Sequence, residues 1–172
     1  MTAVQSFSPE AVQVIISNGQ TSHTITNYME GTFVTVEPAA DRFTPTVGGK
    51  GEEYRALNPN RAFTVTIALS QTSHSNDVLY YLFDEDRETL DGLFNMIIKD
   101  ASGTTLYSDE FSYIMTEPTQ AFSGGGSIEG REWQIRMPKP SYVIGGNGRF
   151  SAATQRSIEQ LGGTIDPRWQ SS

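Results

Sequence analysis

The chain has 172 residues, of which 37% are hydrophobic and 19% charged, and this length and composition fit one folded domain with a sizeable core. It contains no cysteine, which excludes a disulfide framework, a thiolate metal site and a cysteine nucleophile. Its net charge of −8, with 12 basic residues among 20 acidic ones, argues against a protein that grips nucleic acid, whereas a surface past which DNA slides would carry this sign.

The N-terminal part predicts β-structure. Residues 12–16 and 23–26 form a hairpin pattern around Asn18-Gly19, a dipeptide that tolerates the positive φ angles of a type I′ turn. A third strand is expected over residues 32–37, with Pro38 ending it. The first residues lack a secretory signal pattern and no window approaches the ~20 apolar residues of a membrane span, so we expect a soluble chain without membrane insertion.

Residues 39–60 break this pattern with glycines, prolines and charges. A segment this long is usually functional or becomes ordered against a partner. We expect a long hairpin of polar, wet character, with arms at residues 43–47 and 52–57 and Gly51 at its tip.

The strand over residues 61–70 has the clearest period of two in the chain. Phe63, Val65, Ile67 and Leu69 alternate with Thr64, Thr66 and Ala68, which is typical of a strand buried on one face only.

One main helix is predicted over residues 75–88, with Ser75 as a candidate N-cap, Asp77 in the first turn and Gly92 after its end. A second hairpin follows, from residues 93–99 and 104–107 with Gly103 in the turn, and residues 111–115 predict a separate strand.

The rest of the chain predicts a glycine-rich loop over residues 120–130 and two more strands over residues 132–137 and 142–144. Aromatic residues at strand spacing are expected in the core: Phe63, Phe94, Phe111, Tyr113 and Trp133. A short helix is expected over residues 151–161, and the tail ends with one large side chain, Trp169. The fold class is therefore mainly β, a sandwich or barrel, with one main helix packed on the sheet; residues 1–148 form the domain and residues 149–172 an extension.

Motifs for catalysis or ligand binding are incomplete. Residues 48–51 lack the hydroxyl residue and the first glycine of a phosphate loop. Asp84, Asp86 and Glu88 alternate like calcium ligands, but the glycine and the final glutamate of such a loop are missing. His23 and His74 have no partner at ligand spacing. We predict no catalytic residue, metal or cofactor, and no enzyme.

Several blocks, in this order, resemble the tail tube proteins of contractile-tailed bacteriophages. They are Arg42–Gly48, Phe63–Leu79, Ile97–Thr105, Arg131–Ile135 and Val143–Asn147. The resemblance covers roughly residues 12–147; the glycine-rich insert around Gly124 and the extension beyond Asn147 depart from it.

The resemblance implies a structural subunit of hexameric rings that stack into a tube inside a contractile sheath. The negatively charged lumen of this tube would conduct DNA, and the tape measure protein during assembly. The partners would be further copies, the sheath protein, and the baseplate and tail terminator proteins, in a virion assembled in the host cytoplasm.

On this interpretation two groups of residues are candidate contact sites. Residues 39–60 would form a contact arm between rings or subunits, carried by Arg42, Lys50, Glu52, Glu53 and Arg55. Thr64 and Thr66 would face the lumen or a neighbouring subunit. The alternative is a β-sandwich that binds a small molecule or glycan, with the loops at Gly48 and Gly124 forming a rim.

Overall fold

The computed structural model describes residues 6–146, 151–165 and 167. It contains a 3-10 turn η1 (Pro9–Ala11), ten strands and two helices: β1 (Val12–Ser17), β2 (Ser22–Thr24), β3 (Val34–Pro38), β4 (Phe43–Val47), β5 (Glu53–Leu57), β6 (Phe63–Ser70), α1 (Ser75–Thr89), β7 (Phe94–Asp100), β8 (Leu106–Thr116), β9 (Gly130–Met137), β10 (Ser141–Val143) and α2 (Ala152–Gln160). This mainly β architecture, with one main helix and a short C-terminal helix, confirms the predicted fold class.

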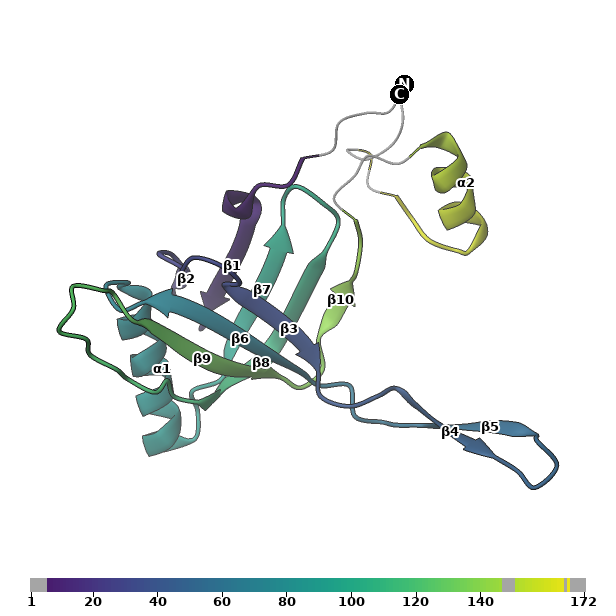
Figure 1. Cartoon of the computed structure of the whole chain (residues 1–172), viewed down its shortest axis with the longest axis horizontal. Coiled ribbons are helices and arrows are strands. Elements are labelled where there is room, and N and C mark those ends of the chain that lie inside the picture. Colours follow the sequence, from purple (N-terminus) through teal and green to yellow (C-terminus); the bar gives the residue numbers. More distant parts are fainter. Residues whose placement is uncertain (1–5, 147–150, 166, 168–172) are drawn as a thin grey trace.

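Most strands form a single antiparallel sheet in the order β2-β1-β7-β8-β9-β6-β3, while β10 pairs with β8 and β4 pairs only with β5. The sheet bends at β8, whose first part pairs with β7 and β10 and whose last part pairs with β9. As a result β3, β6 and β9 cross over β1, β7 and β8, as Figure 1 shows.

The hydrophobic core lies between these two halves of the bent sheet. On β6 the burial alternates along the whole strand, with Val65, Ile67 and Leu69 fully buried. Val14 of β1 and Met96 of β7 belong to the same cluster. The predicted division of β6 into a core face and a polar face is therefore confirmed.

β8 differs from the prediction of two separate strands. It is one strand of 11 residues, with a bulge where Phe94 pairs with Ser112 and Met96 with Asp109. The extra residue on β8 reverses the alternation, so Asp109 and Ser112 are both buried while Phe111 is 60% exposed. The expected core position of Phe111 is wrong for this reason.

The start of α1 also differs in detail. The N-cap is His74 and makes no side-chain capping bond, so the prediction of Ser75 as N-cap is wrong. Ser75 is buried instead, and its Oγ accepts a hydrogen bond from the Thr26 N–H at 3.0 Å and lies 2.9 Å from His23 Nε2. The buried Ser75 hydroxyl therefore links the start of α1 to the connection between β2 and β3 by a hydrogen bond.

The end of α1 requires a glycine. Thr89 is the last helical residue and Leu90 adopts a left-handed conformation with φ 58°. At Gly92 a Cβ would lie 2.6 Å from the Leu82 carbonyl oxygen, a distance too short for any other residue.

The first hairpin is confirmed as a pairing, because Ile15 faces Thr24 and Ile16 faces His23. Its turn is not type I′: Gly19 has φ 88°, but Asn18 is not among the described residues with positive φ. Asn18 Oδ1 instead accepts hydrogen bonds from the N–H groups of Gln20 and Thr21.

The C-terminal helix is confirmed as α2, which Ser151 caps through a bond from the Thr154 N–H. The predicted domain boundary after residue 148 and the tail residue Trp169 lie outside the described residues.

Candidate assembly surfaces

The arm is the hairpin of β4, β5 and their turn, residues 41–58. It leaves the body at the end of β3 and extends away from the sheet (Figure 1). All five predicted contact residues lie on it and are exposed: Arg42, Lys50, Glu52, Glu53 and Arg55. At the tip, the backbone N–H of Lys50 donates a hydrogen bond of 3.2 Å to Glu52 Oε2.

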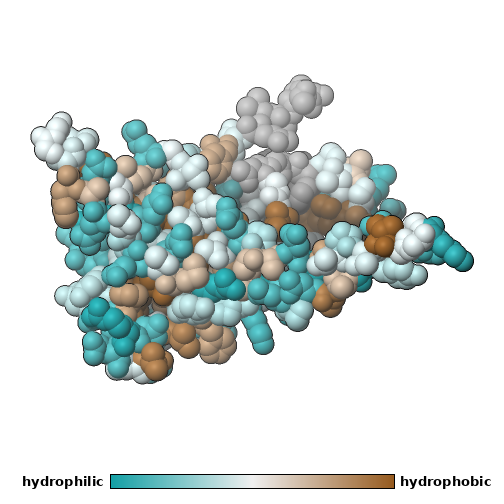
Figure 2. Space-filling model, turned by 60° about the horizontal axis from the view of Figure 1, so that its bottom comes forward, coloured by the Kyte–Doolittle hydropathy of each residue, from teal (hydrophilic) through white to brown (hydrophobic). Residues whose placement is uncertain are grey.

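One face of the arm is more apolar than its sequence predicts. Phe43 pairs with Leu57, Pro45 with Arg55 and Val47 with Glu53, so these six side chains share one face of the ribbon. Phe43, Val47 and Leu57 are 42%, 69% and 58% exposed, and Figure 2 shows apolar residues on the extended hairpin. The arm is exposed to solvent as expected, but the expectation that it is polar is wrong for this face.

Arg55 belongs to this apolar face through its stacking. Its guanidinium carbon lies 4.3 Å from the centroid of the Phe43 ring, within the range of a cation–π contact. The arm thus presents an apolar strip that carries one cation and one carboxylate, Arg55 and Glu53.

The polar face is the side of β3, β6 and β9 that points away from the core. Thr64 pairs with Glu37 and Arg136, and Thr66 with Thr35 and Gln134. Thr64 and Thr66 are half-buried. The structure therefore gives both threonines a polar, partly exposed neighbourhood on the main sheet, which is separate from the two-stranded sheet of the arm.

Three strands of the main sheet have one unpaired side among the described residues. β3 pairs only with β6, β2 only with β1, and β10 only with β8. Unpaired strand sides expose N–H and C=O groups that bind another strand readily. The sheet therefore offers open edges at both ends of its order.

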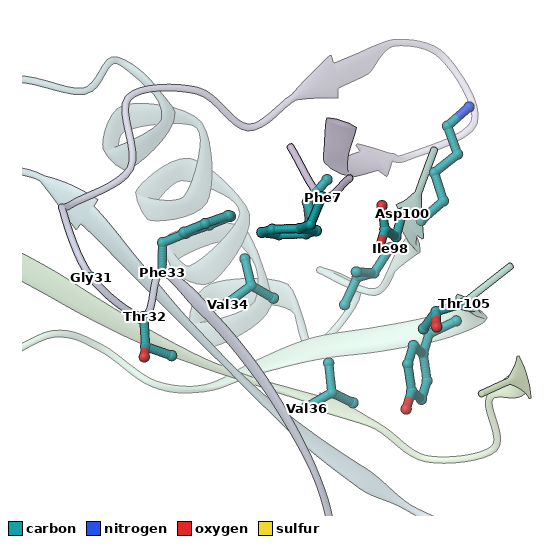
Figure 3. A pocket seen from close by; sticks show the side chains of 12 residues that line it. Phe7, Gly31, Thr32, Phe33, Val34, Val36, Ile98, Asp100 and Thr105 are labelled. Carbon is teal, nitrogen blue, oxygen red and sulfur yellow. The ribbon is translucent and has the colours of Figure 1, made fainter. Parts of the chain in front are cut away.

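An apolar groove of about 390 Å³ lies between β3 and the β7–β8 hairpin. Its lining is Phe7, Val12, Gly31, Thr32, Phe33, Val34, Val36, Ile98, Lys99, Asp100, Thr105 and Tyr107. In Figure 3 the rings of Phe7 and Phe33 point toward each other at one side, with Val34 and Val36 below them. Two charged residues of β7, Lys99 and Asp100, and two threonines also belong to the lining.

A second, more polar hollow of about 520 Å³ lies at the end of the polar face. Three carboxylate residues contribute to it: Glu30, Glu117 and Glu132. This end of the polar face is consequently acidic.

Buried polar groups in the structure hold the fold together. Trp133 Nε1 donates to Asn76 Oδ1 at 2.9 Å, and Asn76 Nδ2 donates to the carbonyls of Ser70 and Ser73. The buried carboxylate of Asp109 accepts from the N–H groups of Phe111 and Lys139 at 2.7 and 2.8 Å. These contacts join α1 to β9, and the bend of β8 to the β9–β10 turn.

Within the described part of the chain no group of three His, Asp or Glu residues is placed to hold a metal ion. Its helices also include none that is both long and apolar enough to cross a bilayer. The loops at Gly48 and Gly124 lie at opposite ends of the molecule (Figure 1), so they do not form the shared ligand rim that the alternative interpretation expects.

Sequence reasoning located the arm but missed the groove. Val34, Val36 and Ile98 have the ordinary alternation of strand residues, and no local signal shows that they line an open hollow. Only the crossing of the two sheet halves brings β3 beside β7.

Comparison with known proteins gives one close relative in sequence. The chain is 38% identical over 167 residues to structural protein ORF10 of Pseudomonas phage KPP10, covering 95% of each chain. No protein-family model matches the sequence.

Solved structures that share the fold include two from the anti-feeding prophage. One is the anti-feeding prophage cap, a tube-terminating cap, with a TM-score of 0.54 at 10% identity over 84% of this chain and 95% of that one. The other is the 6-fold symmetrised anti-feeding prophage baseplate, with a TM-score of 0.53 at 8% identity over 83% of this chain and 97% of that one. The fold is thus found in subunits of these assemblies, and the sequence match is decisive: the chain belongs to the family of phage structural proteins that includes ORF10 of Pseudomonas phage KPP10.

Proposed function

We propose that this chain is the tail tube subunit of a contractile phage tail. Its copies form hexameric rings, and the rings stack into a tube inside a contractile sheath. DNA leaves through the lumen, which the tape measure protein occupies during assembly. The further partners are the sheath, baseplate and tail terminator proteins, and the assembled protein is part of the virion.

The observation that carries this proposal is the construction of the β3–β6–β9 part of the sheet. One side is core, with Val65, Ile67 and Ile135 fully buried, while the other side is polar and partly exposed. β3 also has an unpaired edge among the described residues. A sheet of this kind is completed when a neighbouring copy pairs with its edge and the polar face surrounds a solvent-filled bore.

The charge of the polar face supports the proposed passage of DNA. Carboxylates of Glu37 and Glu132 border the face, against the single guanidinium of Arg136. The acidic hollow with Glu30 and Glu117 continues from it. Repeated around a ring, a surplus of carboxylates repels phosphates, so that DNA passes without binding.

The two solved structures with the same fold are a second, independent support for the proposal. One belongs to a tube-terminating cap and the other to a baseplate with 6-fold symmetry. A subunit of a tube-terminating cap and a subunit of an assembly with 6-fold symmetry both agree with the role in hexameric rings of a tube that we propose here.

Negative-stain microscopy of the purified protein tests this function. We expect rings or tubes of uniform bore at high protein concentration, or growth on a baseplate or tube seed. Subunits that remain monomeric at high concentration in the presence of such a seed would overturn the proposal.

A further inference from the structure

We propose that the indole of Trp169 docks in the hollow between the C-terminal extension and the end of β10, so that the extension closes over the sheet of its own chain. This hollow has a volume of about 690 Å³. The docking does not depend on assembly into a tube. It gives a use to the part of the chain that departs from the tail tube resemblance.

One wall of the hollow is the end of the sheet, which is apolar and open. Leu106 of β8 and Val143 of β10 line it together with Ile144, and these three residues are 40%, 56% and 70% exposed. Leu106 pairs with Val143, so their side chains lie on the same face of the sheet. An apolar side chain that covers this wall removes exposed apolar surface from water, which is favourable.

The position of this wall is fixed by contacts after β10. Thr105 Oγ1 donates to the Gly145 carbonyl at 2.9 Å and accepts from the Gly145 N–H at 3.2 Å. A Cβ at Gly145 would collide with Thr104 Oγ1, so the glycine lets the chain approach the β7–β8 turn this closely. Ile144 is therefore held in the wall by the sheet itself.

The opposite wall is formed by the extension, which reverses direction after α2. The N–H of Gly163 donates to the Ile158 carbonyl at 2.9 Å and the N–H of Gly162 to the Glu159 carbonyl at 3.0 Å. With Gly162 at φ 84°, these bonds form a Schellman motif. The reversal brings Ile165 to the same hollow as Ile158. Both isoleucines are half-buried, whereas most of the described extension is exposed.

Trp169 is the side chain that suits this space. It is the one large apolar side chain of residues 166–172. Ile165 lines the hollow, and four further residues span at most about 14 Å, so the indole stays within reach of it. A tryptophan buries roughly 150–250 Å² and its N–H needs an acceptor, which Asp100 and Thr104 of the lining supply.

Tryptophan fluorescence tests the docking. The chain has two tryptophans, and Trp133 is only 3% exposed. Subtracting the emission of Trp169→Phe from that of the natural chain isolates the emission of Trp169. A docked-to-free ratio of about three to one is sufficient for this measurement, and it raises the thermal midpoint by no more than about 3 °C.

The variant that tests the wall is Ile144→Lys. We expect it to raise the acrylamide quenching constant of Trp169 at least about twofold, because the cation replaces apolar surface on which the indole docks. Ile128→Lys is the matched control, since Ile128 is also exposed, at 53%, and lies outside this lining. It changes the net charge equally and should quench like the natural chain. Neither isoleucine belongs to the core cluster, and thermal unfolding verifies that both variants fold.

Trypsin supplies a second, independent measurement at the bond between Arg168 and Trp169. Cleavage there releases residues 169–172, which mass spectrometry detects, and a docked indole withdraws this bond from the protease. We expect the release to be at least about twofold faster in Ile144→Lys than in Ile128→Lys.

The measurements use concentrations at which size-exclusion chromatography shows monomers, so ring formation does not affect them. Shielding of Trp169 that survives dilution and is lost only in Ile144→Lys supports the docking. A Trp169 as accessible in the natural chain as in Ile144→Lys, or affected equally by both lysine variants, overturns it. Shielding that disappears on dilution assigns the indole to the hollow of a second copy and overturns docking within the chain.

Discussion

Asn76 is the residue that most directly ties the helix to the sheet. It is buried, accepts from the Trp133 indole and donates to two carbonyls of the β6–α1 turn. Replacing it with alanine would leave the buried Trp133 indole N–H without this acceptor, and such a loss has a cost. The carbonyls of Ser70 and Ser73 would lose one donor each and keep the backbone N–H groups of Ser73 and Asn76.

We expect Asn76→Ala to lower the free energy of unfolding by about 2–3 kcal/mol, measured by urea denaturation. The matched control is Asn95→Ala, since the buried Oδ1 of Asn95 accepts no hydrogen bond among the described residues. Its effect should stay below about 1 kcal/mol. Equal losses in both variants would contradict the importance of the Trp133 contact.

Tyr28 makes stability depend on pH in alkaline solution. Burial raises the pKa of Tyr28 from its ordinary value of 10.0 to about 12. Between these values the unfolded chain releases the phenolic proton while the folded chain keeps it, so the contribution of Tyr28 to stability is present below pH 10 and is lost as pH rises toward 12.

We therefore expect the unfolding free energy of Tyr28→Phe to fall less between about pH 9 and about pH 11 than that of the natural chain. Tyr81→Phe is the control, because Tyr81 is 70% exposed, and it should follow the natural curve. An unchanged slope in Tyr28→Phe would show that other groups cause the alkaline loss.

At the scale of elements, the arm is separable from the sheet. Its base is closed by a hydrogen bond from the Ala39 N–H to the Ala62 carbonyl at 2.9 Å, next to the start of β6. Residues 41–58 can be removed without touching this bond or the core cluster.

Replacing residues 41–58 with a short glycine linker should leave the thermal midpoint within about 3 °C of the natural value, which corresponds to ~1 kcal/mol for a chain of this size. The same change, or the double reversal Glu52→Lys/Glu53→Lys, should abolish or strongly reduce ring stacking in negative stain. Normal stacking by the shortened chain would disprove the contact role of the arm.

The strands β6 and β8 show which features of the fold can be predicted from the sequence and which cannot. The alternation on β6 predicted its buried and polar faces because both depend only on local periodicity. β8 was divided wrongly because Ser108, Asp109 and Glu110 resemble a polar turn. Asp109 is buried there because two backbone N–H groups bond its carboxylate. One of them, from Phe111, is local, but the other comes from Lys139, 30 residues further along the chain, and a local pattern does not reveal such a partner.

The same limit applies to the candidate surfaces. The arm was predictable because glycines, prolines and charges interrupt the strand pattern over residues 39–60. Its apolar face was not, because it depends on the register that places Phe43 opposite Leu57. The groove depends on how the two sheet halves cross, which is a property of the whole fold.

At the scale of the whole molecule, the division into a domain and a C-terminal extension is a prediction on which the surroundings of α2 bear. Every residue of α2 except Gln155 and Ile158 is exposed, and its nearest hollow is shared with the β7–β8 turn and the end of β10 through Ile158 and Ile165. The core cluster contains no residue of the extension.

Truncation after residue 148 should therefore shift the thermal midpoint by less than about 3 °C, as measured by calorimetry. Ring formation by the truncated chain, compared in the same micrographs with the full chain, then shows whether the extension contributes to assembly. A fall in the midpoint of more than about 6 °C would contradict the division into a domain of residues 1–148 and an extension.

The direction of the arm has a consequence for the two ends of a stack. In the tube proposed above, each arm points away from its own body and contacts the next ring, so a finite stack would be polar. One end would display a row of undocked hairpins, and the other would display the surface that receives them. A protein that terminates the first end must receive hairpins, and one that terminates the second must cover that surface, so no single capping protein fits both.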